Sequence, residues 1–288
     1  MPPKINLTKE QIMVALRTYK TRKEAANALG ISHDTLEARV KEFEIGEVKS
    51  NKVLLWDLET GGINALQADL GFVLVFGWKW LGSNKVHTWK VSDYPNWFSK
   101  ESGINDKPLL KDIVKIMESA DLLVAHYGDK FDRRFFQGRC AIHNLSPPPP
   151  TKQRDTWRIA KTAFKFGSNR LANLAETLDL GEKKHQKTHD EWPGWWFKAM
   201  AGNENAINAM AVYCAQDVKT LEQVYLRIRQ YDNPHPALFD DRTRCSVCGS
   251  EVEYNGTAHV GVYTYNRYQC LECGRWGRDR KSIKEHDK

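Results

Sequence analysis

The sequence predicts an α/β domain with a helical segment before it and a cysteine-rich segment after it. Strand-like and helix-like stretches alternate between residues 50 and 233, which is the pattern of a mixed central sheet flanked by helices. Apolar residues at three-to-four spacing near the amino terminus indicate short helices, and paired cysteines near the carboxyl terminus indicate a small metal-bound unit. We therefore divide the chain into segments 1–48, 50–233 and 241–288.

Composition is that of a globular protein with an anionic partner. The chain is 41% hydrophobic and 27% charged, and no run of about 18 apolar residues marks a membrane span. The opening stretch "MPPKINLTKEQ" has no apolar core of a signal peptide, so we expect a cytoplasmic protein with no membrane association. Its six cysteines are then metal ligands or buried thiols. The formal net charge of +7 favours nucleic acid as the partner.

Short helices are expected in residues 7–45. Apolar spacing in "TKEQIMVALRTY" indicates the first, "TRKEAANALG" ends at Gly30, and "SHDTLEARVKEF" begins with Ser32 as its cap. Helix, short glycine turn and helix form the helix-turn-helix pattern, and "EAANALGISHDTLEARV" resembles that family, which implies DNA binding. A small bundle for protein contacts is the alternative, because the last helix has a mixed-charge face that would dock poorly on phosphates: Asp34, Glu37, Arg39, Lys41 and Glu42.

The middle segment should fold as a sheet with helices packed on it. Strands are predicted in "KVLLWDLE", "GFVLVFGWKWL", "KVHTWKVSD" and "DLLVAHYG", of which the first three lie close enough in sequence for an antiparallel meander. Helices are predicted in "PLLKDIVKIMES" and in residues 155–166, 169–179 and 204–229. The stretch "SPPPP" predicts a surface turn.

Two carboxylates close the first predicted strand. Because side chains alternate along a strand, Asp57 and Glu59 point to the same face. They would repel each other unless a cation lay between them, and oxygen ligands suit Mg²⁺ or Mn²⁺. Gly61 and Gly62 follow, which lets a ligand approach the backbone. Taken alone, the pair is better explained by turn capping.

Further acidic residues follow the fourth strand and lie on the last helix. Asp132 begins a predicted helix directly after the strand and turn of "DLLVAHYGDKF", and Asp129 is an alternative in the same turn. Tyr213 and Asp217 are four residues apart, so they lie on one face of the helix.

These motifs resemble, in order and spacing, the ribonuclease H-like 3′–5′ exonucleases with four acidic residues. Asp-x-Glu lies on the first strand, an Asp preceded by Phe follows the fourth, and Tyr-x-x-x-Asp lies on the late helix. The stretch "DTWRIAKTAFKFGSNRLANLAETLDLGEK" resembles proofreading domains related to family B polymerases, including stand-alone phage and bacterial versions. The resemblance covers most of segment 50–233 and implies a ribonuclease H-like fold.

The resemblance also implies a site. The four metal ligands for two Mg²⁺ or Mn²⁺ ions would be Asp57, Glu59, Asp132 and Asp217, with Tyr213 orienting the attacking water. A related subgroup has a catalytic His where this chain has Val212, so the tyrosine subgroup fits. Tyr127 departs from the second motif, because such families often have Asn after its His. His126 is expected to orient the turn. Four carboxylates within about 5 Å would repel by roughly 3 kcal/mol per pair at an effective dielectric of about 20, which bound cations cancel.

The implied reaction is metal-dependent hydrolysis at nucleic-acid 3′ ends, with DNA favoured and single-stranded or frayed ends as substrate. A proofreading role would require a polymerase or replication partner. The candidate substrate contacts are the backbone of Thr60 and Gly61 and the side chains of Lys183, Lys184 and Lys187. Trp192, Trp195 and Trp196 either stack on bases or belong to the core. The alternatives are an endonuclease of the same fold, acting on hybrid or branched substrates, and a non-catalytic nucleic-acid adaptor.

The cysteine-rich segment predicts a structural zinc site. Two C-x2-C pairs separated by 21 residues supply Cys245, Cys248, Cys270 and Cys273, a pattern that resembles a zinc ribbon. Four thiolates would fill the coordination shell of one Zn²⁺, and structural zinc contributes on the order of 10 kcal/mol to the folding of so short a segment. Disulfides are the alternative. Basic residues available for nucleic acid are Arg267, Arg275, Arg278, Arg280 and Lys281, and Cys140 and Cys214 are expected to be buried helix thiols.

Overall fold

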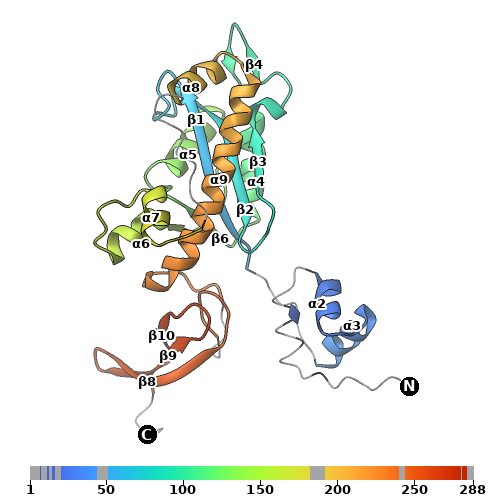
Figure 1. Cartoon of the computed structure of the whole chain (residues 1–288), viewed down its shortest axis with the longest axis vertical. Helices are drawn as coiled ribbons and strands as arrows, with labels where there is room; N and C mark the ends of the chain where they lie inside the picture. Colours follow the sequence, from blue (N-terminus) through green and yellow to red (C-terminus); the bar gives the residue numbers. More distant parts are fainter. Residues whose placement is uncertain are drawn as a thin grey trace. The chain divides into compact units, whose positions relative to one another are not determined.

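The computed structural model describes residues 7, 12, 15–16, 21–43, 51–181, 192–239, 244–279 and 281–283. The chain separates into two compact units, Met1–Asn51 and Lys52–Lys288, which are coloured along the sequence in Figure 1. Among the helices of the described ranges, none combines the length and the apolar character that a membrane crossing requires.

The amino-terminal unit contains α2 (Arg22–Ala28) and α3 (His33–Glu42). Ser32 caps α3 by accepting a hydrogen bond from the Thr35 amide, and Gly30 takes a positive φ of 67° in the turn between the helices. The predicted helix, glycine turn and helix are therefore present. Most of the helix expected from "TKEQIMVALRTY" lies outside the described residues, and DNA binding by this unit stays a prediction.

A five-stranded mixed sheet forms the centre of the second unit. Its strand order is β3-β2-β1-β6-β7, with the bounds β1 Val53–Gly62, β2 Gly71–Trp80, β3 His87–Lys90, β6 Leu122–Ala125 and β7 Lys152–Asp155. The first three strands form the predicted antiparallel meander, and β6 and β7 run parallel to β1. Strand β7 was not predicted, because its short sequence "KQRD" has no apolar run; its place at the sheet edge tolerates polar side chains.

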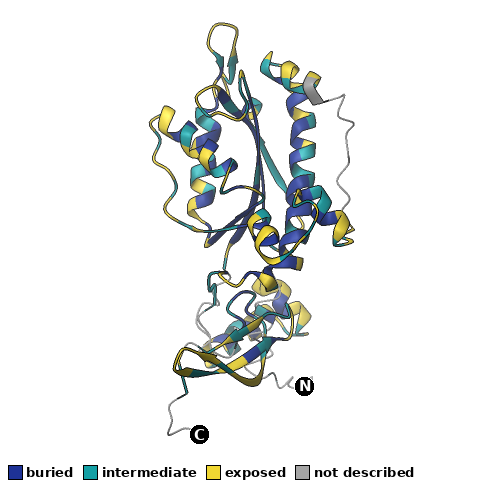
Figure 2. Ribbon diagram, turned by 90° about the vertical axis from the view of Figure 1, so that its left-hand side faces the viewer, coloured by how far each residue is buried: buried dark blue, intermediate teal, exposed yellow. Residues whose placement is uncertain are grey.

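Helices cover both faces of this sheet, as Figure 2 shows, and the predicted mixed sheet flanked by helices is confirmed. Helices α4 (Lys107–Glu118) and α5 (Asp132–Ile142) pack on one face, against Trp56 and Phe76. The opposite face is covered by α6 (Thr156–Ala163), α7 (Leu171–Thr177) and the long α9 (Glu204–Ile228). Outside the sheet, α8 (Trp192–Met200), the short strands β4 (Phe98–Ser99) and β5 (Gly103–Ile104), and the 3-10 turns η1 (Val91–Asp93) and η2 (Arg229–Tyr231) complete the domain.

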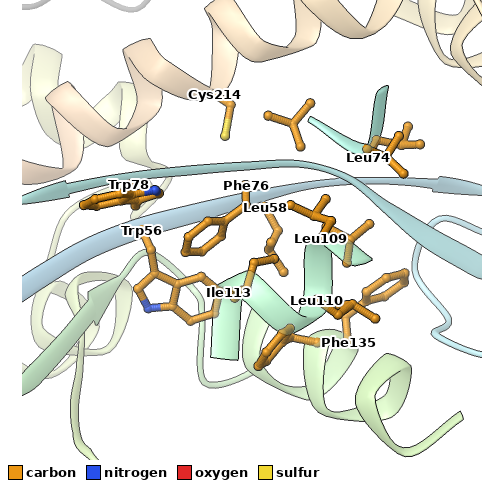
Figure 3. Packing of buried hydrophobic residues seen from close by; sticks show 14 of the residues in the cluster. Trp56, Leu58, Leu74, Phe76, Trp78, Leu109, Leu110, Ile113, Phe135 and Cys214 are labelled. Carbon is orange, nitrogen blue, oxygen red and sulfur yellow. The ribbon is translucent and has the colours of Figure 1, made fainter. Parts of the chain in front are cut away.

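Helix α9 approaches the sheet closely at Gly77, which pairs with Asp57 across β1 and β2. A Cβ at Gly77 would lie 2.6 Å from Cys214 Sγ and 3.3 Å from the Cys214 carbonyl oxygen, so a larger residue would push the helix outward. Figure 3 shows Cys214 pointing from α9 to one face of the sheet, with Trp56 and Ile113 on the other. The absence of a side chain at Gly77 therefore sets the height of α9 above β1.

The cysteine-rich segment folds as a three-stranded antiparallel sheet of β8 (Val252–Val260), β9 (Tyr263–Cys270) and β10 (Trp276–Arg278). We call it the ribbon. The Arg275 guanidinium donates hydrogen bonds to the carbonyl oxygens of Asp232 and Asn233, which follow η2. These bonds fix one side of the ribbon to the sheet domain, and both belong to the same compact unit.

Candidate active site

A pocket of about 330 Å³ opens beside Asp57 of β1, next to the carboxyl end of β6. It brings together the five residues predicted to be catalytic, although they are spread over about 160 positions of sequence. Its lining residues are Asp57, Leu58, Glu59, His126, Tyr127, Phe131, Asp132, Trp196, Tyr213 and Asp217.

Asp57 and Glu59 converge on the α9 side of the sheet. One carboxylate oxygen of each and the Cys214 Sγ atom all lie within 4.8 Å of one another, and only 7% of Glu59 is exposed. Two carboxylates held this close in a largely buried position repel each other unless a cation lies between them. Hard oxygen donors are the ligands that Mg²⁺ and Mn²⁺ prefer, so this donor set fits such an ion.

Asp132 is the first residue of α5 and is 4% exposed. Burial above all, together with the nearby charge of Asp155, raises the pKa of the Asp132 carboxyl to about 7, against hydrogen bonds that include one from the Leu58 amide. Near neutral pH, the ionised form of Asp132 therefore needs additional positive charge in the pocket. Binding of a divalent cation would supply that charge.

Asp129, the alternative ligand in the same turn, lies elsewhere. Its carboxylate oxygens are 3.7 Å from Arg133 Nη2 and 3.8 Å from Arg158 Nη1. It lines a separate cavity of about 430 Å³ beside Pro147, whereas Asp132 lines the carboxylate pocket. The geometry favours Asp132 for the predicted role.

Tyr213 and Asp217 enter the pocket from α9, one helical turn apart. Their side chains are hydrogen-bonded to each other. Burial raises the pKa of Tyr213 well above its usual value, and the negative charges of Asp217, Glu59 and Asp57 add to this effect. The hydroxyl therefore remains protonated at neutral pH, which makes Tyr213 a hydrogen-bond donor and not a base.

Cys214 is buried, as predicted, but its contact with the site was not foreseen. Its Sγ atom lies 3.5 Å from Asp57 Oδ2 and 3.6 Å from the Asp57 carbonyl oxygen. Burial raises the pKa of the thiol well above its usual value, so the thiol stays protonated beside the carboxylate. Cys214 thus contacts Asp57 from the side of α9.

Asp155 also escaped the sequence analysis. It ends β7, and its carboxylate accepts hydrogen bonds from the amides of Tyr127 at 2.8 Å, Asp129 at 3.2 Å and Trp157 at 2.9 Å. It therefore holds the turn that connects β6 to Asp132. The available signal was the stretch "DTW" at a helix start, which indicates an N-cap and says nothing about a partner in another turn.

Tyr127, the departure from the family pattern, lies in the same turn. Its φ is 62°, a left-handed conformation in which Asn is enriched and a bulky residue is strained. The hydrogen bond to Asp155 and an edge-on contact with the Trp157 ring at 5.0 Å stabilise it. His126 Nδ1 lies 2.9 Å from Thr156 Oγ1, and its role in orienting the turn stays a prediction.

Of the predicted substrate contacts, Thr60 and Gly61 are buried, and the three lysines lie outside the described residues. Thr60 is buried, and its carbonyl oxygen accepts a hydrogen bond from Trp196 Nε1 at 2.6 Å. Gly61 is buried against Leu74 and Met200, so there is no room for a Cβ. Their contact with a terminal nucleotide stays a prediction. Lys183, Lys184, Lys187 and the side chain of Trp192 lie outside the described residues, whereas Trp195 and Trp196 pack against the core and Trp196 also lines the pocket.

The four ribbon cysteines form a second cluster, distinct from the carboxylate pocket. Their Sγ atoms lie within 4.8 Å of one another, including Cys245 and Cys273 at 3.7 Å and Cys248 and Cys270 at 3.4 Å. A tetrahedral site with metal–sulfur bonds of about 2.3 Å has sulfur–sulfur distances of about 3.8 Å. All four thiols are free, so the donor set fits a tetrahedral thiolate site better than disulfides.

We predict that Asp155→Asn weakens Mn²⁺ binding at the carboxylate pocket roughly 10- to 100-fold. Asp155 holds the turn that positions Asp132, and residues that orient metal ligands without touching the metal have effects of this size. The amide would direct N–H groups at backbone donors, so the free energy of unfolding should also fall by about 1–3 kcal/mol. Isothermal titration calorimetry and urea unfolding would measure both. Asp129→Asn is the matched control, since it removes only partly exposed ion pairs in the same turn. Equal Mn²⁺ affinity in Asp155→Asn and wild type would contradict this role.

Comparisons with known proteins identify the family of the sheet domain. Residues 54–229 match the family model RNase_H_2, described as RNase_H superfamily. A family B DNA polymerase from the hyperthermophilic archaeon Pyrobaculum calidifontis is structurally similar, with a TM-score of 0.47 and 12% sequence identity over 65% of this chain and 26% of the polymerase. The chain thus spans about a quarter of that polymerase, and no curated protein matches it. The match to the family model spans more than half of the chain and confirms the resemblance found in its motifs: this protein belongs to the RNase_H superfamily.

Proposed function

We propose that the protein is a metal-dependent 3′–5′ exonuclease, with DNA as the favoured substrate. Membership of the superfamily supports a nuclease and hence a nucleic-acid substrate. The observation that carries the proposal is a single pocket that gathers four carboxylates and a protonated tyrosine. A domain that only bound nucleic acid would gain nothing from buried carboxylates facing phosphates.

Two Mg²⁺ or Mn²⁺ ions would be held by Asp57, Glu59, Asp132 and Asp217. When bound, such ions compensate the carboxylate charge, lower the pKa of a bound water and stabilise the leaving oxygen of a phosphodiester. Mutual repulsion and burial make these carboxylates unfavourable without cations, so metal binding and substrate binding depend on the same charges.

Tyr213 would position the attacking water. Its hydroxyl bonds to Asp217 and stays protonated, so it can orient a water in the pocket without removing a proton. The aromatic rings of Tyr127, Phe131 and Trp196 line the same pocket and offer faces for a terminal base. A pocket of small-ligand size suits a single end nucleotide better than continuous duplex, which supports an exonuclease over an endonuclease.

Digestion of end-labelled oligonucleotides tests the proposed reaction. With Mg²⁺ or Mn²⁺, 5′-labelled DNA should shorten stepwise from its 3′ end, 3′-labelled DNA should release its label at once, and a chelator should stop both. Asp217→Asn should lower the rate by at least about a hundredfold while the metal-free protein keeps or gains thermal stability, since one repelling charge is removed. Cleavage of closed circular DNA would instead identify an endonuclease. If the metal-loaded protein cleaves no labelled DNA or RNA, the result would support the alternative of a non-catalytic nucleic-acid adaptor.

Tyr213→Phe isolates the contribution of the hydroxyl. The ring packing and the four carboxylates remain, so turnover should fall roughly ten- to a hundredfold, or about 1.4 to 2.7 kcal/mol, with substrate affinity nearly unchanged. Single-turnover kinetics would measure the chemical step. Tyr225→Phe is the matched control, because it removes a buried hydroxyl of α9 that bonds to His235 outside the pocket. Unaltered turnover in Tyr213→Phe would reduce this residue to a packing role.

The ribbon cysteines would bind one structural Zn²⁺. We predict one zinc per chain, retained through dialysis that removes Mg²⁺ and detected by elemental mass spectrometry. Replacing Cys245 and Cys248 by Ser should abolish zinc binding and unfold the ribbon, because thiolate ligation supplies much of the folding free energy of such small units. Cleavage of short oligonucleotides should persist. Cys140→Ser, which alters a buried thiol of α5, should keep its zinc; a zinc-free wild-type ribbon would contradict the assignment.

A further inference from the structure

One face of the ribbon sheet gathers arginine and aromatic side chains. Residues directly opposite in antiparallel strands share a face, and Arg267 is opposite Arg278 while Gln269 is opposite Trp276. Alternate residues of β9 continue this face toward the tip of the hairpin. We define the arginine–aromatic face as Tyr263, Tyr265, Arg267, Trp276 and Arg278.

Cation–π contacts order this face. Arg278 Cζ lies 4.0 Å from the centroid of the Tyr265 ring, and Arg267 Cζ lies 4.9 Å from that of the Trp276 ring. The Arg267 Nε group also donates a hydrogen bond to the Asn255 carbonyl oxygen. Each guanidinium group thus lies beside an aromatic ring of the same face.

The face remains open to solvent. Trp276 is 46% exposed and Tyr263 is 58% exposed, and Arg267 and Arg278 are also exposed. In contrast, Tyr268 and Cys270 on the other face of β9 are buried. The small core and the cysteine cluster therefore lie opposite the arginine–aromatic face, and packing within the ribbon does not explain its rings.

The other basic residues of the ribbon have different positions. Arg275 bonds to the carbonyl oxygens after η2, so it holds the ribbon to the sheet domain instead of facing a ligand. Arg280 lies outside the described residues. Glu253, which is opposite Gln269, places one acidic side chain at an end of the same face. Lys281 is exposed but follows the end of β10. Arg267 and Arg278, with interleaved aromatic rings, are therefore the basic residues on the face itself.

We propose that the arginine–aromatic face binds single-stranded nucleic acid, at a surface separate from the nuclease pocket. Guanidinium groups would neutralise phosphates, and exposed rings would stack on bases. A duplex conceals its base faces, so stacking on Tyr263 and Trp276 requires an unpaired strand. The face therefore complements single strands in both charge and shape.

Fluorescence anisotropy with the full chain tests this proposal. The Asp217→Asn protein, in which cleavage is expected to be impaired, would be titrated without added Mg²⁺ or Mn²⁺ into 5′-fluorescein-labelled oligodeoxythymidylate and into a labelled hairpin duplex at several salt concentrations. In this background, the double substitution Arg267→Ala/Arg278→Ala should weaken binding of the single strand. It should also lower the slope of log affinity against log salt concentration by about 1.4, since each phosphate contact contributes about 0.7. Trp276→Ala should weaken binding roughly five- to a hundredfold with little change in slope.

Matched variants separate stacking from charge and from folding. Arg267→Lys/Arg278→Lys keeps both charges, so it should keep the salt slope but lose affinity, because an ammonium group stacks poorly on a ring. Lys100→Ala removes one exposed charge from the β4–β5 turn and should leave the affinity nearly unchanged. Retained zinc in each variant would show that the ribbon is folded. Unchanged affinity and slope in the zinc-containing alanine double variant, or equal losses for duplex and single strand, would overturn the proposal.

Discussion

The close contact of α9 with the sheet at Gly77 is the constraint on which the candidate site depends. Because no Cβ occupies that position, Cys214 reaches Asp57. Tyr213, directly before Cys214, and Asp217, three residues after it, line the pocket beside the end of the strand. Apolar side chains of α9 that pack against β1 and β2 supply the stabilising free energy for this approach. The sheet core therefore places Tyr213 and Asp217 opposite Asp57 and Glu59, and it does so against the repulsion among the carboxylates.

That repulsion links the stability of the domain to its proposed chemistry. Glu59, Asp132 and Asp217 are each less than 10% exposed, so water screens their charges poorly. The protein compensates in part with neutral donors, namely the Leu58 amide, the Tyr213 hydroxyl and the Cys214 thiol. None of these carries positive charge. A bound divalent cation would complete the compensation and stabilise the native state by mass action, so the same charges that strain the metal-free domain make it bind metal.

The sequence predicted the residues of the pocket but not what holds them. Apolar, periodic segments placed Asp57, Asp132 and Asp217 on their elements, and the resemblance of the motifs to the exonucleases singled these residues out. Strand β7 has no such pattern, and Asp155 at its end has a local explanation as a helix cap that hides its bonds to a turn 26 to 28 residues away. The contact between Cys214 and Asp57 spans 157 residues, and only tertiary packing creates it. Periodicity reports which face a residue occupies, whereas its partner depends on register between distant elements.

In the ribbon too, the sequence identifies the charged residues but not their partners. Composition makes Arg267, Arg275 and Arg278 equivalent, but strand register places the first and third beside aromatic rings and turns the second toward backbone carbonyl groups. This division bears on the proposed reaction, because an enzyme that removes single nucleotides must keep or regain its strand after every cut. A strand held by the arginine–aromatic face of the same chain would have a raised effective concentration at the pocket without any new contact there. In the proposed enzyme, the pocket would determine which bond is cleaved, and the ribbon would lengthen the time that the strand remains within reach.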